Sequence, residues 1–196
     1  MKILRRLLVG LVVLVLLAIV AVLVAQRFSD GPIGPISGGP LRQGELVTDP
    51  NVDWSKVLEP GKTIELELVS TGQSRTTGAF VRDGQLYVPC DLGYLAHKLP
   101  SAGMRATLAV ISLVKHWNED AVKDGRVVLR IAGKRYERQA VRVTDPELLS
   151  SMRENMEKEA ERIFAAQGGL LKAPGDPEKL WIFRMDPRGA TPSSGE

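Results

Sequence analysis

The feature that most restricts this chain is an unbroken apolar run near its N-terminus. Residues 7–25 consist only of Leu, Val, Ile, Ala and Gly. A helix of this length spans about 28 Å, close to the roughly 30 Å hydrocarbon core of a bilayer. Because the run is apolar on every face, it does not fit a helix that lies flat on a membrane surface. The sequence therefore predicts one transmembrane helix, with membrane lipid as the partner of residues 7–25.

The charges around the run predict its orientation. Three basic residues precede it (Lys2, Arg5 and Arg6), whereas the charges behind it nearly cancel. The positive-inside rule then predicts a cytoplasmic N-terminus and a main domain outside the cytoplasm, in the periplasm if the cell is Gram-negative. A cleaved signal peptide is the alternative, but its apolar core is usually about 7–15 residues long, and no Ala-x-Ala site closes this run. An uncleaved signal-anchor is the favoured interpretation.

The rest of the chain is electrically neutral. The first 30 residues hold four of the 26 basic and one of the 23 acidic residues, so the remainder carries 22 of each. A neutral domain lacks the broad positive field that non-specific nucleic-acid binding needs, so nucleic acid is not an expected partner. Cys90 is the only cysteine, and His97 and His116 form no metal-ligand pair. No disulfide within the chain and no metal site are therefore expected.

Composition divides the chain into four parts. Residues 1–29 are the cytoplasmic N-terminus and anchor, residues 30–59 are rich in Gly and Pro, residues 60–186 carry the domain, and residues 187–196 read as a disordered tail. Pro removes backbone donors and Gly weakens order, so the second part is expected to be extended. It is either a plain linker or a segment that packs on the domain through Ile33, Ile36 and Leu41.

Alternating apolar and polar residues predict short antiparallel strands. Residues 64–68 alternate Ile or Leu with Glu, and strand patterns flank the pair Asp83-Gly84, which is a strong hairpin signal. Residues 126–131 alternate in the same way and turn at Gly133-Lys134 into residues 135–143. In this last segment the pattern slips after Arg138, as it would at a β-bulge.

One helix is predicted over residues 146–167. Asp145 can cap it and Pro146 suits its first position, while apolar residues recur at spacings of three and four in one stripe (Leu149, Met152, Met156, Ala160, Ile163). A last short strand is expected at residues 180–185. The predicted fold class is mainly β (α+β): a small antiparallel β-barrel with a peripheral C-terminal helix, or alternatively an open α+β sandwich.

The segment Met104–Val114 allows two interpretations. It is nearly all apolar but far too short to span a bilayer. It is either a buried helix or a stretch that dips into the membrane beside the anchor.

Residues 70–77 (STGQSRTT) are the most suggestive polar segment. They offer one guanidinium, several hydroxyls and a Gly that allows close approach of the backbone. Arg forms forked charged pairs with phosphate, and Ser and Thr can donate to it. The segment is either a phosphate site or an ordinary polar turn.

The order of these features resembles a known family over about residues 60–145. A strand ends in Thr71-Gly72-x-x-Arg75, the hairpin of residues 80–88 follows, and Trp117 precedes the strands at 124–131 and 135–138. This arrangement resembles the split β-barrel of pyridoxamine-phosphate-oxidase-like proteins, and its deazaflavin-dependent nitroreductase branch is most similar.

The resemblance implies a split β-barrel and a flavin-type ligand. In that family the turn and the neighbouring strand hold the phosphate tail of FMN or a deazaflavin, which here implies contacts from Arg75, Thr76 and Thr77, with Trp117 near the pocket. Relatives often pair, so a homodimer is also implied. The resemblance assigns no catalytic residue here and leaves open whether the chain is an enzyme. Two hypotheses follow: a membrane-anchored oxidoreductase-like protein, or a non-enzymatic cell-envelope protein that binds a lipid-like ligand or another membrane protein.

Overall fold

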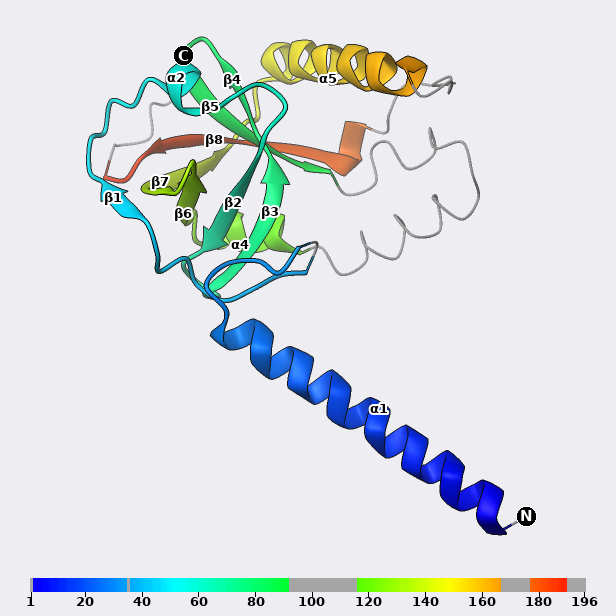
Figure 1. The fold of residues 1–196 in the computed structure, drawn as a ribbon. Coiled ribbons are helices and arrows are strands. Elements are labelled where there is room, and N and C mark those ends of the chain that lie inside the picture. Colours follow the sequence, from blue (N-terminus) through cyan, green and yellow to red (C-terminus); the bar gives the residue numbers. More distant parts are fainter. Residues whose placement is uncertain (1, 35, 92–115, 167–176, 190–196) are drawn as a thin grey trace.

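A long helix and a curled sheet make up the molecule (Figure 1). The computed structural model describes residues 2–34, 36–91, 116–166 and 177–189, so the predicted segment Met104–Val114 lies outside the described residues. In chain order the elements are α1 (Lys2–Phe28), β1 (Glu45–Val47), α2 (Trp54–Val57), β2 (Thr63–Leu68), β3 (Gln73–Gly78), β4 (Phe80–Arg82), β5 (Gln85–Asp91), α4 (Trp117–Lys123), β6 (Arg126–Ile131), β7 (Lys134–Arg142), α5 (Pro146–Ala166), η2 (Pro177–Lys179) and β8 (Leu180–Pro187).

Helix α1 projects away from the rest of the molecule (Figure 1). Its span Leu8–Phe28 has a mean hydropathy of 3.4, and none of it is buried within the protein. By length and composition it is able to cross a membrane, as the apolar run predicts. Which side of a membrane the sheet occupies remains a prediction.

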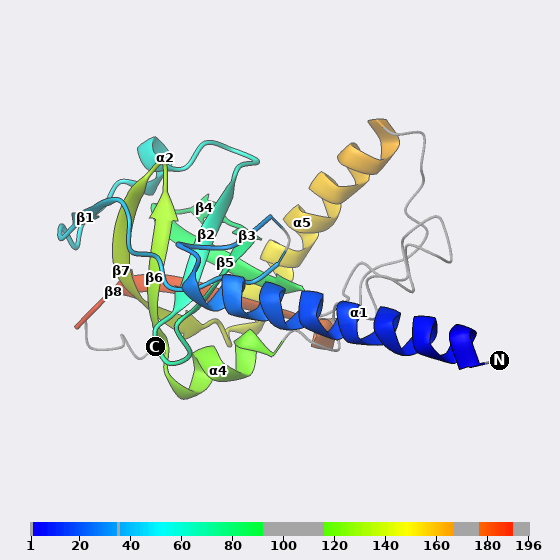
Figure 2. The ribbon, with the colours of Figure 1, turned by 60° about the horizontal axis from the view of Figure 1, so that its bottom comes forward.

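The strands form one sheet in the order β3–β2–β6–β7–β8–β5–β4, with β1 beside β7. Every neighbouring pair is antiparallel except β1 with β7. The two edge strands of this path, β3 and β4, are consecutive in the chain and separated only by Ala79, so the sheet curls toward closure (Figure 2). The predicted fold class is confirmed: an N-terminal apolar helix precedes an antiparallel half-barrel of the α+β split-barrel type.

The inside of the half-barrel is filled by buried side chains from five strands (β2, β5, β6, β7 and β8) and from α2 and α4. Helix α4 contributes Trp117, whose ring lies 5.2 Å from that of Phe183 on β8. Both rings are almost fully buried. The core members with no measurable exposure are Leu66, Leu68, Leu86, Val88, Cys90, Val127, Leu129 and Phe183. Such a filled interior resembles the packed core of a small barrel rather than a ligand-holding lumen.

Helix α5 covers the outer face of the sheet and confirms the predicted helix at 146–167. The carboxylate of Asp145 accepts the backbone N–H groups of Glu147 and Leu148 at 2.8 and 3.1 Å, which caps the first turn. Met152 is buried against a second apolar cluster that includes Ile182. The first part of the apolar stripe (Leu149, Met152 and Met156) is therefore on the face that α5 turns toward the sheet.

The two tight hairpins turn at Asp83-Gly84 and at Ala132-Gly133. Both residues of each pair have positive φ, as a type I′ turn requires. The first turn confirms the prediction. The second lies one residue earlier than the predicted Gly133-Lys134, because the ladder between β6 and β7 already includes Lys134.

The bulge predicted after Arg138 is wrong. Pairing along β7 is continuous with both β6 and β8, and Tyr136, Arg138 and Ala140 are buried in strict alternation. Arg138 therefore occupies an inward position that the sequence pattern reserved for an apolar residue. The slip in the pattern came from this buried arginine and not from an extra residue.

Residues 29–44, here called the strap, connect α1 to the barrel and pack across β2 and β3. Gly38 and Ser74 exchange two backbone hydrogen bonds of 2.9 and 3.0 Å. Leu41 is 3% exposed, whereas Ile33 and Ile36 are 47% and 45% exposed. The segment is thus a packed one. The expectation that it packs through Ile33 and Ile36 is wrong, because both side chains are exposed and the two residues exchange backbone hydrogen bonds in a surface turn.

Close backbone contacts explain the glycines of the strap. A Cβ atom at Gly38 would overlap the carbonyl group of Gly31, and one at Gly39 would overlap the carbonyl oxygen of Ser29. The strap folds back on itself at these points. Only a residue without a side chain fits there.

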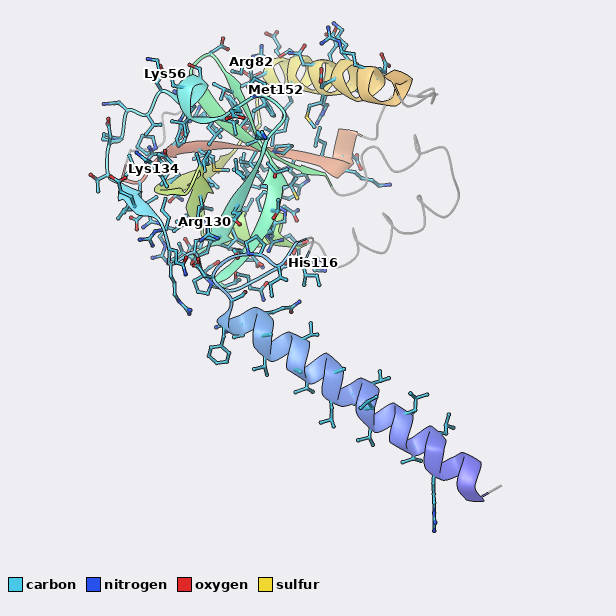
Figure 3. All side chains as sticks on the ribbon, in the orientation of Figure 1. Lys56, Arg82, His116, Arg130, Lys134 and Met152 are labelled. Carbon is cyan, nitrogen blue, oxygen red and sulfur yellow. The ribbon has the colours of Figure 1, made fainter. Side chains whose placement is uncertain are left out.

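Arg130 fixes the strap to the barrel. Its guanidinium donates to Asp30 Oδ2 at 2.6 Å, to the Asp30 carbonyl at 3.2 Å and to Glu65 on the neighbouring strand β2. The Arg130 side chain is only 15% exposed, so water screens this network little (Figure 3). Asp30, Arg130 and Glu65 are here called the clamp.

Candidate functional site

The residues predicted to contact phosphate lie on a strand rather than in a turn. The turn between β2 and β3 spans residues 69–72, where Gly72 donates its N–H to the Leu68 carbonyl at 2.9 Å and has a positive φ. Arg75, Thr76 and Thr77 follow within β3. Residues 73–78 contain no apolar side chain, so they lack the alternation that predicts a strand, and the sequence did not predict β3.

Alternation along β3 sends the three residues to two faces. Arg75 is paired opposite Leu66, whose side chain has no measurable exposure inside the barrel. Residues directly opposite each other in an antiparallel ladder point to the same face. Arg75 and Thr77 therefore face inward, whereas Thr76, opposite Glu65, faces the strap and its hydroxyl lies 3.5 Å from the Gly34 carbonyl.

Arg75 and Trp117, both predicted as site residues, are brought together although 42 positions separate them in the chain. The Arg75 guanidinium carbon lies 5.7 Å from the centroid of the Trp117 ring, a cation–π distance. Trp117 is 1% exposed and Arg75 is half-buried. Helix α4 thus places its first residue beneath the inward-facing arginine of β3.

Three buried polar atoms at this point have no hydrogen-bond partner among the described residues. They are Arg75 Nε, Trp117 Nε1 and Oδ1 of the next residue, Asn118. Burying an amide or a ring N–H without a partner costs roughly 1–3 kcal/mol, and native proteins rarely tolerate several such atoms together. Two of them, Arg75 Nε and Trp117 Nε1, are donors on side chains that lie in cation–π contact, so a polar ligand would find two donors there.

Burial also acts on the charge of Arg75. Loss of solvent lowers the pKa of its guanidinium below the ordinary value, and the nearby Cys90 and Asp120 partly oppose this effect. No salt bridge joins Arg75 to a carboxylate in the part of the chain that the structure describes. A desolvated cation that is in no salt bridge attracts an anion more strongly than a solvated one does.

The site lies at the end of the barrel from which α1 leaves. The guanidinium of Arg27, in the last turn of α1, donates to the Thr71 carbonyl in the β2–β3 turn at 3.2 Å. Helix α4 lies near the same end, where His116 precedes it (Figures 2 and 3). A ligand bound between Arg75 and Trp117 would therefore sit close to the surface of any membrane that α1 crosses.

Cavities elsewhere in the described residues do not reach this site. One of about 250 Å³ lies between α5 and the ends of β7 and β8, lined by Arg142, Leu149 and Trp181. Another of about 220 Å³ lies beside β1. Across the ranges that the structure describes, no three His, Cys, Asp or Glu side chains gather as a metal site would require.

Sequence reasoning missed several polar residues that the fold buries, among them Glu67, Asn118 and Arg138. Asn118 follows Trp117 on a short helix, and nothing in the local pattern marks it as inward-facing. Arg138 left a signal, since it interrupted the alternation of its strand. An arginine at an expected inward position was the observation that could have found it.

Comparison with known proteins adds a distant likeness. No family model matches the chain, and no curated protein matches it. Among solved structures, it is similar to a Listeria innocua protein described as a pyridoxamine 5′-phosphate oxidase, with 14% identity and a TM-score of 0.44 over 69% of this chain and 90% of that one.

Proposed function

We propose that this chain is a membrane-anchored split-barrel protein that binds a flavin or deazaflavin through its phosphate at the α1-proximal end of the barrel. The observation that carries the proposal is the pair of unpartnered buried donors, Arg75 Nε and Trp117 Nε1, on two side chains in cation–π contact. A phosphate accepts from donors of both kinds.

The residues at this site fit a phosphate in part. Arg75 supplies a desolvated guanidinium, Thr77 supplies a hydroxyl on the same face of β3, and Trp117 supplies an indole N–H. Thr76 does not fit, because it faces the strap. A bound flavin would supply hydride chemistry, while this chain would bind and orient it.

Replacing Arg75 should abolish most of the binding. We expect purified full-length protein in neutral detergent to bind FMN or a deazaflavin, measured by near-ultraviolet and visible absorbance and by quenching of flavin fluorescence. Because a charge-assisted hydrogen bond contributes about 1.5–3 kcal/mol, Arg75→Ala should weaken binding about 10- to 100-fold. Arg75→Lys keeps the charge but loses the fork, so it should recover only part of the affinity.

The matched control is Arg126→Ala. Arg126 lies on β6, is exposed and, within the ranges that the structure describes, forms its ion pair with Asp124 two residues away, so its loss should leave binding unchanged. Equal weakening by both substitutions would point to a general charge effect and would count against the site. Circular dichroism of each variant shows whether the barrel is still folded.

A second candidate is a non-enzymatic protein that binds a lipid-like ligand or another membrane protein. The filled interior of the half-barrel favours it, since the cavities described are smaller than the roughly 300–1,000 Å³ of typical small-molecule sites. Protein that is colourless when purified and that ignores added FMN and deazaflavin would leave this candidate in place of the first.

The proposal includes a cytoplasmic N-terminus and a barrel outside the cytoplasm. The basic residues before α1 support this orientation. Protease added to intact cells, or to spheroplasts if an outer membrane is present, should digest the barrel while sparing an N-terminal tag. A barrel that becomes sensitive only after the inner membrane is opened would reverse the orientation.

A further inference from the structure

The C-terminal end of β8 and the end of β1 meet along β7. The antiparallel ladder between β7 and β8 ends where Arg138 faces Pro187, and the parallel ladder between β1 and β7 ends where Val47 faces Tyr136. Pro187 has no N–H, which suits the end of a ladder. Strands β1 and β8 thus pair with successive parts of the same side of β7. A cavity of about 220 Å³ lies where one pairing ends and the other begins.

Arg138 is the buried charge that lines this cavity. It is 3% exposed, and its guanidinium carbon lies 5.1 Å from the centroid of the Trp54 ring. Its Nη atoms donate to the carbonyls of Glu137 and Asp49 at 2.8 and 3.0 Å. No carboxylate within the described ranges lies at salt-bridge distance from it, and its Nε has no partner there.

An uncompensated buried cation is costly, and two carbonyls with one aromatic face offset only part of that cost. Burial accordingly lowers the pKa of Arg138 below its ordinary value, while Asp49 and Tyr136 act in the opposite direction. Strand β7 would hold an apolar residue at this position without any such cost. The presence of arginine calls for a counter-charge.

A second arginine supplies more donors at the same cavity. Arg188 pairs with Glu137 at 2.6 Å and donates to the Val127 carbonyl at 3.2 Å. The cavity lining therefore contains two guanidinium groups against one carboxylate, and Val47, Pro50 and Pro187 form an apolar part. The excess positive charge and the mixed lining favour an anion with a small apolar body.

We infer that this cavity, bounded by β1, β7 and the end of β8, binds a small organic oxyanion through Arg138 and Arg188. The charged group is a carboxylate or a phosphate, both of which match the guanidinium fork. Because about 220 Å³ is below the usual range for a cofactor site, the ligand is smaller than a flavin. Strand β1 and the end of β8, which border the cavity, lie on the flank away from α1 (Figures 1 and 2), so a water-soluble anion reaches it more readily than a lipid headgroup.

Anion titration of the full chain in neutral detergent tests this inference. Sodium phosphate and sodium butyrate are added separately at constant ionic strength, with sodium chloride as the baseline, and binding is followed by calorimetry and by tryptophan fluorescence, to which Trp54 contributes. We expect saturable binding of at least one anion, and the tighter of the two identifies the type of charged group.

Arg188→Gln is the main variant, because Arg188 lies at the cavity rim and its loss should leave the core intact. It should weaken anion binding about tenfold or more, and Arg138→Lys should do the same if it folds. Arg126→Gln, on the adjacent strand but outside the cavity, should bind as the unmodified protein does. No saturable binding of either anion, or equal binding by the Arg188→Gln variant, would overturn the inference without affecting the proposed flavin site.

Discussion

A chain that begins at Ser29 should fold and leave the membrane fraction, whereas a chain that begins at Glu45 should not fold. The two differ only by the strap. The strap buries Leu41, whose N–H donates to Glu67 at 2.8 Å, and its Gly39 carbonyl accepts the hydroxyl of the fully buried Ser74 at 2.5 Å. Losing the buried Leu contributes about 1.5–3 kcal/mol, and each buried group left unpaired adds about 1–3 kcal/mol.

Together these losses come to about 3.5–9 kcal/mol, which overlaps the lower part of the roughly 5–15 kcal/mol total stability of a typical domain. Circular dichroism and urea titration of the two shortened chains measure the difference. The partition of the longer one is a separate readout, because fifteen Leu, Ile and Val residues in the apolar run favour insertion by roughly 5–9 kcal/mol in sum. Equal stability of the two shortened chains would mean that the strap is a passive linker.

A point substitution reports on the same strap in the intact protein. Gly38→Ala should destabilise the barrel by about 1–3 kcal/mol, because the new Cβ would press on the Gly31 backbone. Gly78→Ala is the matched control, since a Cβ at Gly78 meets nothing within 4 Å and Gly78 has no positive φ.

Arg130→Met should lower the free energy of unfolding by about 2–3 kcal/mol. The substitution removes the positive centre of the clamp and leaves the Asp30 and Glu65 carboxylates facing each other, with side chains 21% and 30% exposed. A fully buried pair typically costs roughly 3–5 kcal/mol when one partner is lost, and the partial exposure here reduces that figure. Arg126→Met, on the same strand but 55% exposed, should change stability little.

Acid should narrow the difference between the Arg130→Met variant and the unmodified protein. Burial raises the pKa of Asp30, but hydrogen bonds from the Arg42 backbone, from Arg130 and from the Gln43 backbone lower it by more, so the net pKa is below the ordinary value. The clamp's contribution is therefore complete above about pH 4 and is lost as the pH falls through the folded-state pKa of Asp30. Urea denaturation of both proteins between pH 7 and pH 2 measures this, and a constant difference would contradict it.

Much of the architecture was readable from periodicity. Local rules predict three features: the apolar run, the Asp83-Gly84 hairpin and the apolar stripe of α5 that includes Met152. Each could therefore be predicted from the sequence. The predicted bulge failed because periodicity alone cannot distinguish an inserted residue from a buried charge. Arg138 is covered by Trp54, which comes from a distant segment of the chain.

For the candidate site, the sequence predicted individual residues but not how they are arranged. Arg75 and Trp117 were singled out by resemblance, but their contact depends on how α4 enters the barrel, which no local pattern encodes. The assignment of Thr76 to the same cluster ignored strand alternation, because residues 70–77 were read as a turn. The clamp was not predicted at all, since Asp30, Glu65 and Arg130 lie 35 or more positions apart and their pairing is set by the register of β2 with β6.

The clamp also governs how this protein would meet others in a bilayer. A free tether of 16 residues would let the barrel wander over roughly 20–24 Å, so that every side of it could come into reach of a neighbour. Because the clamp holds the strap against the barrel, the barrel would have little freedom to move relative to α1 and would rotate only together with it. Any protein diffusing in the same bilayer would then meet the same face of the barrel at a fixed distance from the membrane surface. The loss of orientational entropy when the two proteins bind would therefore be small.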